Sequence, residues 1–183
     1  MNFIETKLKG AYIIEVSTWQ DERGIFARTY CKKEFKKINH TQEFVQFNHS
    51  SNNQIGTLRG MHYQKNPFAE IKLIRCIRGS VFDVIVDIRK SSPTFLKWIG
   101  IELSAKNMKM IYVPRGFAHG FLTLENDSEL LYHHTDFHEP SAECGIKYDD
   151  PSLNIDWPGR IMLISAKDKG YPTISKNFKG IKS

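Results

Sequence analysis

Between positions 81 and 88 the chain carries apolar side chains with a period of two. Every second residue from Phe82 to Ile88 is apolar, and Asp83 and Asp87 lie between these positions. A period of two places the apolar side chains on one face of a β-strand and the aspartates on the other. The pattern predicts a half-buried strand over residues 81–88.

Turn residues next to this segment predict hairpins. Gly79-Ser80 separates it from the strand-like residues 72–78, and glycine at the first turn position suits a type II′ turn between antiparallel strands. We therefore expect these two strands to pair with each other. The same arrangement recurs at residues 108–113 and 117–124, around Pro114-Arg115-Gly116.

The rest of the chain adds further short strands and little helix. Residues 32–39 are the best helix candidate, and Ser165 could cap a second short helix that ends near residue 169. A series of short strands predicts an antiparallel sandwich or a closed barrel. No repeat or linker divides the chain, so we expect one domain over residues 1–183, with flexibility left open for the tail from about residue 173. The other strand candidates are residues 44–50, 57–64 and 128–136.

Composition narrows the class of protein. With 183 residues the chain is long enough to bury a core without disulfides. Its three cysteines, Cys31, Cys76 and Cys144, are odd in number and widely spaced, so neither a disulfide framework nor a thiolate metal site is expected. Charges interrupt the N-terminal segment, and no later apolar run could span a bilayer. We expect a soluble cytoplasmic protein without a membrane partner.

The net charge of +6 favours anionic partners in general. Lysines cluster at residues 32–37 and 176–182, but acidic residues are interspersed through the rest of the chain. A dense basic stripe with stacking aromatics, which nucleic-acid binding would need, is missing from the sequence. We interpret both clusters as solvated surface and expect no nucleic-acid partner.

Three motifs give the sequence a specific resemblance. They are Gly56-Thr-Leu-Arg-Gly-Met-His-Tyr-Gln64, Ser91-Ser-Pro-Thr-Phe95 followed by Lys97-Trp98, and Pro114-Arg-Gly-Phe-Ala-His-Gly-Phe121. Together they resemble the dTDP-4-dehydrorhamnose 3,5-epimerase family, and the similarity continues to residue 172. The resemblance implies a cupin-type β-sandwich or jelly-roll barrel, and a homodimer whose N-terminal segment reaches toward the neighbouring subunit. Supporting matches lie at residues 21–26, 44–50, 72–76, 149–151, 155–158 and 165–168.

The reaction implied by the resemblance is epimerisation of a nucleotide-linked 4-keto-6-deoxy sugar. In the family this step turns dTDP-4-keto-6-deoxy-D-glucose into dTDP-4-keto-L-rhamnose, a precursor of cell-surface polysaccharide. The ketone acidifies the hydrogens on its two neighbouring carbons, so a base, a donor to the enolate oxygen and an acid across the ring are sufficient. Neither a redox cofactor nor a metal is required.

Four residues match the family's catalytic positions. His62 matches the base, since imidazole titrates near neutrality. Asp168 matches the acid that orients this base, Tyr132 the phenol that protonates the opposite face, and Lys72 the cation beside the enolate oxygen. Without the motifs around them, the histidine would be read as structural, the aspartate as a turn residue, the tyrosine as core and the lysine as solvated.

Further positions match the family's substrate contacts. Arg59 and Arg23 match pyrophosphate contacts, because a guanidinium fork suits phosphate oxygens. Gly120 beside His119 would let the backbone approach a ligand closely. Outside the motifs, each position could equally be a surface or turn residue. The expected substrate-binding set is Arg23, Phe26, Arg28, Gln46, Asn48, Arg59, His119, Glu143 and Lys167.

The spacing of Arg59 and His62 sets a geometric condition. Their separation is odd, so strict alternation would put their side chains on opposite faces of a flat strand. If both line one pocket, the strand must bend or bulge near Gly60. Regular pairing through this segment would contradict the site.

Departures from the family pattern keep alternatives open. Arg28 stands where the family commonly has glutamate, Phe47 replaces an aspartate, and His133-His134 replaces Lys-Thr. Another nucleoside diphosphate such as CDP, inversion at C3 or C5 alone, and a non-catalytic sugar-nucleotide-binding cupin are the alternatives. A metal-dependent cupin is disfavoured, since the motifs offer only His62 and His119 toward the several ligands that such a site needs.

Overall fold

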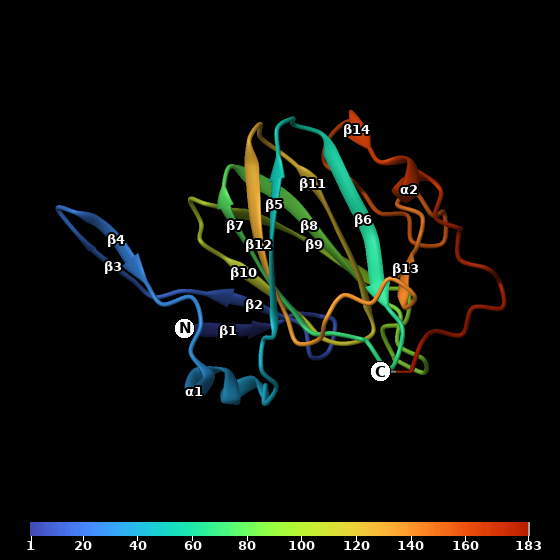
Figure 1. Cartoon of the computed structure of the whole chain (residues 1–183), viewed down its shortest axis with the longest axis horizontal. Helices are drawn as coiled ribbons and strands as arrows, with labels where there is room; N and C mark the ends of the chain where they lie inside the picture. Colours follow the sequence, from blue (N-terminus) through green and yellow to red (C-terminus); the bar gives the residue numbers. More distant parts are fainter. Residues whose placement is uncertain (183) are drawn as a thin grey trace.

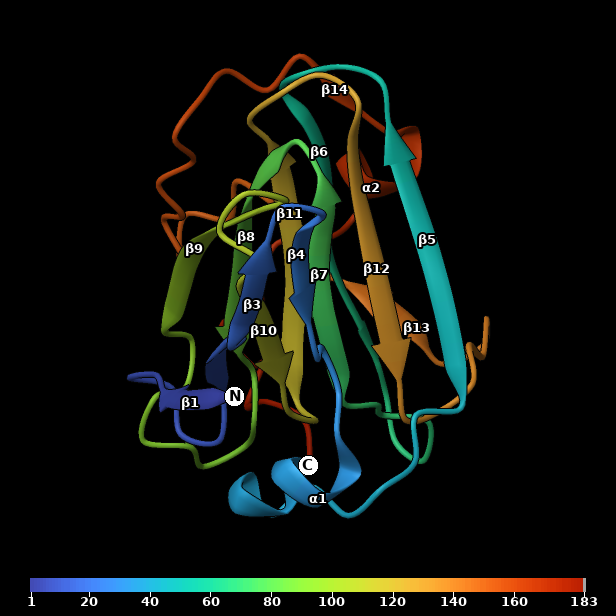
Figure 2. The same cartoon turned by 90° about the vertical axis from the view of Figure 1, so that its left-hand side faces the viewer.

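Two antiparallel β-sheets packed face to face form the body of the protein in the computed structural model, which describes residues 1–182 (Figures 1 and 2). This architecture confirms the predicted cupin-type sandwich. The first sheet has the order β1 (Asn2–Glu5), β2 (Tyr12–Glu15), β10 (Met110–Val113), β7 (Lys72–Arg78), β12 (Ser128–His134) and β5 (Gln46–Asn52). The second has the order β13 (Glu143–Gly145), β6 (Thr57–Gln64), β11 (Phe117–Thr123), β8 (Ser80–Asp87) and β9 (Trp98–Ser104), with β14 (Leu163–Ile164) parallel to β6.

The main core lies between the two sheets, because each presents alternate apolar side chains to the other. Ile74 and Leu130 of the first sheet and Val81, Ile85 and Phe121 of the second are at most 1% exposed and belong to one cluster. Burying an aliphatic or aromatic side chain of this size stabilises the fold by roughly 1.5–3 kcal/mol. The cluster thereby holds β7 and β12, which carry Lys72 and Tyr132, against β8 and β11. Strand β6, which carries His62, is fixed to this body by its pairing with β11.

The two predicted hairpins are wrong, because the strands concerned belong to different sheets. β7 pairs with β10 and β12, whereas β8 pairs with β9 and β11. Gly79, at a φ of 66°, turns the chain from the first sheet into the second, and a Cβ there would lie 2.5 Å from Oγ of Ser128. β10 and β11 are divided in the same way around Gly116. A turn signal marks a change of direction, but the pairing partner depends on which arrangement buries both sheets.

The strand over residues 81–88 is buried on both faces, so the half-buried prediction is also wrong. Asp83 and Asp87 are 0% exposed. The odd-numbered side chains of β8 face the space between the sheets, whereas Val84, Val86 and Ile88 face a second apolar cluster outside the sandwich. Chain that follows β13 covers this outer face (orange to red in Figure 1). Its covering side chains are Ile155, Trp157, Ile174, Phe178 and Ile181.

Asp87, at the end of β8, has its buried charge fully compensated. Its carboxylate accepts hydrogen bonds from Nε and Nη2 of Arg89, at 2.9 and 2.7 Å, and from the hydroxyls of Ser92 and Thr94, both at 2.6 Å. Burial opposes ionisation, but these donors outweigh it and hold the pKa of Asp87 below its ordinary value.

Helix is minor, as predicted. The first helical segment consists of α1 (Lys32–Phe35) and the 3-10 turn η1 (Lys36–Ile38). The second is α2 (Ala166–Lys169), where Oγ of Ser165 accepts a hydrogen bond from the amide of Asp168 at 3.0 Å, the cap that the sequence predicts. None of the helices in residues 1–182 is long and apolar enough to cross a membrane.

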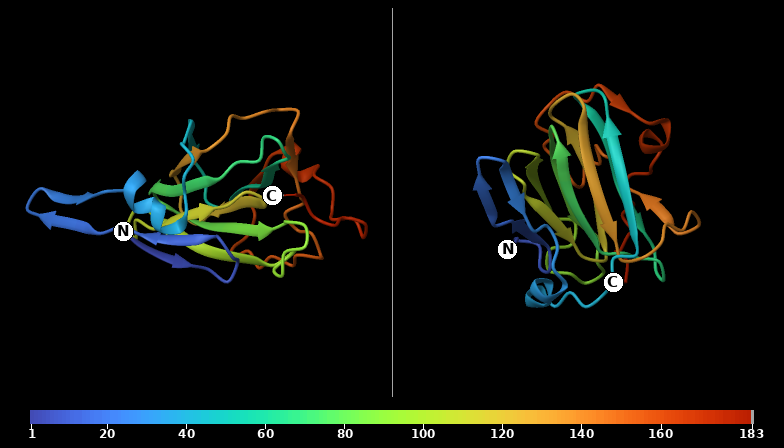
Figure 3. Two further views of the ribbon diagram at one scale, coloured as in Figure 1. Left: turned by 90° about the horizontal axis from the view of Figure 1, so that it is seen from below. Right: turned by 60° about the vertical axis from the view of Figure 1, so that its left-hand side comes forward.

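A separate hairpin projects from the sandwich. Strands β3 (Thr18–Asp21) and β4 (Gly24–Ala27) pair only with each other and extend away from both sheets (Figures 1 and 3). Trp19, Ile25 and Phe26 on this hairpin are 57, 58 and 72% exposed. The hairpin therefore carries an apolar surface that the chain itself leaves uncovered.

Candidate active site

A bulge in β6 brings Arg59 and His62 to one groove. His62 lies opposite His119 on β11, but Arg59 lies opposite Phe121, so the strand gains one residue between these pairs. Gly60, at a φ of 135°, makes the irregularity possible, since a Cβ there would lie 2.5 Å from Cα of Gly120. The expected bulge is confirmed. Both side chains border a groove of about 420 Å³, which we call the outer groove, together with Thr57, Leu58, Leu163, Ile164, Ser165, Lys167 and Asp168.

His62 is held by Asp168 in an imidazole–carboxylate pair. Nε2 of His62 lies 2.9 Å from Oδ1 of Asp168, and the other carboxylate oxygen accepts the amide hydrogen of Gly60 at 3.1 Å. Asp168 is only 4% exposed. Burial works against its charge, but the hydrogen bonds from His62 and Gly60 prevail and hold the pKa of Asp168 below its ordinary value. The carboxylate therefore stays ionised at neutral pH, and it both orients the imidazole and stabilises a proton on it.

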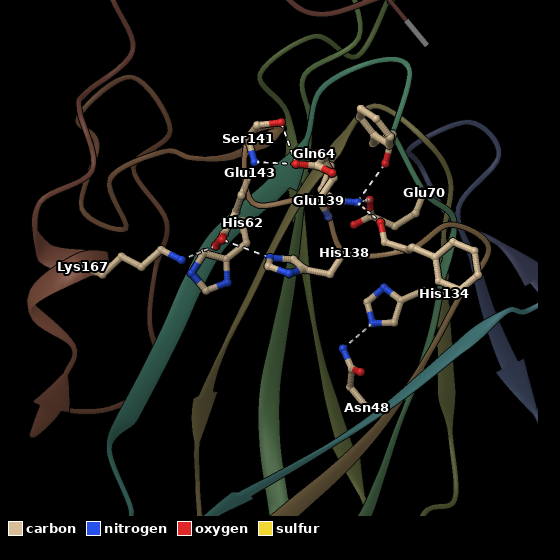
Figure 4. Close-up of polar contacts among 12 residues, drawn as sticks. Asn48, His62, Gln64, Glu70, His134, His138, Glu139, Ser141, Glu143 and Lys167 are labelled. Atoms are coloured by element: carbon tan, nitrogen blue, oxygen red, sulfur yellow. Dashed lines mark hydrogen bonds and ion pairs between the residues drawn. The ribbon is translucent and has the colours of Figure 1, made fainter.

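His62 also borders a cavity of about 140 Å³ between the ends of the sheets, where Lys72 is the buried cation. Nζ of Lys72 lies 3.0 Å from Oε1 of Glu70, whose other oxygen accepts a hydrogen bond from Nε2 of Gln64 at 2.6 Å. This chain of contacts fixes the ammonium group in place. The remaining lining residues are Gln46, Asn48, Tyr63, His134, Asp136, His138 and Glu143, several of which appear in Figure 4.

Tyr132, on the facing sheet, lies next to this cavity. Its ring stacks on His134 at a centroid distance of 6.1 Å and meets the ring of His119 edge-on at 6.0 Å. His119 in turn lies directly opposite His62 on the neighbouring strand, so His62 and Tyr132 face the same space between the sheets. Burial, and next the negative charge of Asp83, raise the pKa of Tyr132 well above its ordinary value. The phenol therefore keeps its proton at neutral pH.

The rim of the cavity carries two of the expected binding residues. Oε1 of Glu143 accepts a hydrogen bond from Nζ of Lys167 at 2.5 Å, and its other oxygen lies 3.2 Å from Nε2 of His138 (Figure 4). Burial opposes the charge of Glu143, but these contacts prevail and lower its pKa. The rim is thus a set of paired charges close to His62.

Comparison with known proteins decides the family. A family model described as dTDP-4-dehydrorhamnose 3,5-epimerase matches residues 5–176. The chain belongs to the dTDP-4-dehydrorhamnose 3,5-epimerase family. An enzyme of that name from Shigella flexneri is 47% identical to it, over 92% of this chain and 93% of its own. The crystal structure of one from Elizabethkingia anophelis matches with a TM-score of 0.92 and 41% identity, over 97% of this chain and 98% of its own.

Other solved relatives carry ligands or a different specificity. The Legionella pneumophila enzyme, solved in complex with dTDP-4-keto-L-rhamnose, has a TM-score of 0.92 and 39% identity over 100% of this chain and 98% of its own. A 3′-monoepimerase from Streptomyces bikiniensis, solved with dTDP-quinovose, has a TM-score of 0.85 and 32% identity over 92% of this chain and 85% of its own. Double and single epimerases thus share the fold of this family member.

Three expected binding residues of this epimerase-family chain lie away from the cavity. Arg23 and Phe26 belong to the projecting hairpin, where the guanidinium of Arg23 pairs with Asp21 at 2.5 Å. Arg28, just after the hairpin, pairs with Glu34 of α1 at 3.1 Å. The structure does not bring them to His62 within one chain, because the hairpin pairs with neither sheet.

Three polar residues that line the cavity were not among the expected site residues, although each lies two positions from one of them. Gln64 follows His62 by two positions, Glu70 precedes Lys72 by two and His134 follows Tyr132 by two, and all three line the cavity. The two-residue period of a strand would have found Gln64 and His134, because residues two apart share a face, whereas Glu70 lies just before β7 begins. Across residues 1–182, no three His, Cys, Asp or Glu side chains form a group that could hold a metal ion.

Proposed function

We propose that this protein epimerises a dTDP-linked 4-keto-6-deoxy sugar, converting dTDP-4-keto-6-deoxy-D-glucose to dTDP-4-keto-L-rhamnose for cell-surface polysaccharide. The observation that carries the proposal is the common space faced by the His62–Asp168 pair and by Tyr132 from opposite sheets. Membership of the epimerase family supports the choice of substrate.

In the proposed reaction, His62 removes a hydrogen from a carbon beside the C4 ketone. The C–H electron pair moves into the ring and onto the ketone oxygen, which gives an enolate. Lys72 stabilises the developing oxyanion, and such stabilisation is strong where water is largely excluded, as it is around this side chain with 8% exposure. Glu70 balances the charge of Lys72 before the substrate binds.

Tyr132 supplies the proton from the opposite face. Its O–H bond breaks, a C–H bond forms at the enolate carbon with inverted configuration, and the carbonyl is restored. A phenol suits this step because it stays protonated at neutral pH yet can donate to a carbanion-like carbon. The substrate's own ketone is the electron sink, so the chemistry needs neither a redox cofactor nor a metal.

Substrate contacts follow from the positions around the two cavities. Arg59 and Lys167 offer positive charge to pyrophosphate along the outer groove. Gln46, Asn48 and Glu143 line the cavity that contains Lys72. His119 lies beside Tyr132, where the sugar is proposed to bind.

Arg23, Phe26 and Arg28 are proposed to act in the site of a second subunit. An isolated two-stranded hairpin is marginally stable, and this one exposes Trp19, Ile25 and Phe26. A homodimer in which the hairpin covers the neighbouring subunit would bury that surface and bring the arginines to the substrate.

Inversion of a single carbon is the second candidate function. It is favoured by the solved 3′-monoepimerase relative and by the ring of His134, which stacks on Tyr132 and borders the cavity. Burial, and next the positive charge of Lys72, lower the pKa of His134 to about 4, so a neutral imidazole occupies this wall at pH 7. Its bulk could restrict the ring turn that a second inversion requires.

The proposal is tested with purified protein in heavy water and a panel of dTDP-, CDP-, UDP- and GDP-linked 4-keto-6-deoxy sugars. We expect deuterium at both C3 and C5 of the dTDP sugar, followed by NMR and mass spectrometry, and slower labelling with other bases. Label at one carbon would favour the single epimerase. Binding without label in any sugar would contradict catalysis.

Mixing two inactive variants tests the shared site. A heterodimer of Arg23→Ala and His62→Ala protomers contains one site with both native residues. We expect the mixture, after subunit exchange, to regain about a quarter of the wild-type rate, since half of randomly formed dimers are heterodimers with one intact site of two. The control mixes His62→Ala with Asp168→Ala, whose residues lie in one chain's pair and should show no such recovery if Asp168 is essential. Absence of recovery in the first mixture would contradict the shared site.

A further inference from the structure

A second imidazole–carboxylate pair lies in the wall beside Tyr132. Nε2 of His119 lies 2.8 Å from Oδ2 of Asp83, which is 0% exposed, and His119 itself is 5% exposed. The two residues come from the adjacent strands β11 and β8 of the second sheet. The alternating pattern of the sequence assigns Asp83 to a solvent face, so this pair is a product of the tertiary structure.

Asp83 is not explained by the stability of the core. Its other oxygen, Oδ1, is buried without a hydrogen-bond partner within residues 1–182. Burying a carboxylate with an unsatisfied oxygen is costly, and an apolar residue of similar size would fit this cluster of aliphatic side chains. Asp87, on the same strand and equally buried, has both oxygens satisfied. The contrast indicates that Asp83 serves its histidine.

The geometry connects this pair to Tyr132. The ring of His119 meets that of Tyr132 at 6.0 Å, with an interplanar angle of 74°. Since Nε2 is occupied by Asp83, Nδ1 is the ring nitrogen left to interact with the phenol or the sugar. A negative charge near Tyr132 opposes a phenolate, and the imidazole of His119, which contacts both Asp83 and Tyr132, stands between that charge and the phenol.

We propose that Asp83 is a positioning residue for the proton donor, holding His119 so that the imidazole supports Tyr132 when its O–H bond breaks and a C–H bond forms on the sugar. This inference deepens the proposed function and rests on it. Asp83 would thus orient the imidazole beside the proton donor Tyr132, as Asp168 orients the imidazole that acts as the base. His119 and Asp83 take no proton from the sugar, and the phenolate regains its proton from solvent when the product leaves.

The test compares the two deuterium exchanges in Asp83→Asn, which preserves the side chain's shape but removes its charge. We expect the exchange that depends on His62 to stay within about threefold of wild type. We expect the completion step that depends on Tyr132 to slow on the order of 10- to 100-fold, the range known for removal of a carboxylate behind a metal-bound histidine. In a Tyr132→Phe background, Asp83→Asn should add no further slowing, because the two residues act in one step.

Asp87→Asn is the matched control, since Asp87 is equally buried but contacts Arg89, Ser92 and Thr94. It should lower the unfolding midpoint and leave the ratio of the two exchange rates unchanged. Equal slowing of both exchanges in Asp83→Asn, no slowing, or additive slowing with Tyr132→Phe would overturn the proposal.

A measurement without substrate separates this inference from the proposed function. In ¹H–¹⁵N spectra of the free protein, Asp83→Asn should move the imidazole resonances of His119 and leave those of His62 in place. Unmoved His119 resonances would overturn the role of Asp83 whatever the substrate is. Wild-type protein that labels no 4-keto sugar would refute the proposed function, with the His119 spectra still reporting on the pair.

Discussion

The His62→Ala variant is expected to lose solvent exchange at both carbons that flank the ketone, with a fall in rate of about 10²- to 10⁴-fold or more. Among residues 1–182, His62 is the only histidine that borders both the cavity and the outer groove, and its imidazole pairs with the buried carboxylate of Asp168. Without it, no enolate forms, so neither carbon can be inverted. Deuterium incorporation followed by NMR at saturating dTDP-4-keto sugar measures the loss directly.

His49→Ala is the control for this variant. His49 lies on the edge strand β5, is paired with Glu129 at 2.9 Å and lines neither cavity. Its removal should leave both exchange rates and the substrate affinity unchanged. Wild-type exchange in His62→Ala, with the fold intact by circular dichroism, would refute the assignment of the base.

The Tyr132→Phe variant is expected to exchange the first hydrogen but to complete epimerisation on the order of 10²-fold or more slowly. The phenylalanine keeps the stacking on His134 and the contact with His119 but has no proton to give. Enolate would still form at His62 and would return its proton to the original face. Labelled starting sugar and partly inverted product should therefore accumulate, which NMR of the reaction mixture would resolve.

Tyr112→Phe is the matched control for the loss of a buried phenol. The hydroxyl of Tyr112 lies 3.1 Å from Nδ1 of His40, away from the cavity, and Tyr112 is 5% exposed. Its variant should lose about 1 kcal/mol of stability and retain the wild-type ratio of the two exchanges. If Tyr132→Phe completes epimerisation at the wild-type rate, another group must be the acid.

Some features of the candidate site were predictable from the sequence. The motif around His62 assigns the family, and the odd spacing from Arg59 to His62 requires the irregularity that Gly60 provides. The cap at Ser165 likewise predicts the short helix that carries Asp168. Each of these depends on residues close together in the sequence, where backbone geometry limits the choices.

Other features depended on contacts between distant segments. The turns at Gly79 and Gly116 were identifiable, but their strands pair across different sheets rather than with each other. Arg23 and Phe26 match substrate contacts in sequence but lie on a hairpin that stands apart from the cavity.

The sequence alone determined the family, the sandwich class and the approximate positions of strands β5 to β8 and β10 to β12, and it proposed the base, because motifs and a period of two are local properties of the chain. Only the tertiary structure decided which strands pair, and that Asp83 lies inside beside His119 rather than in water. The reason is physical: alternation gives a strand two faces, but in β8 the face with Asp83 packs against the other sheet, and the chain after β13 covers the face with Val84. Neither burial is visible in a local pattern.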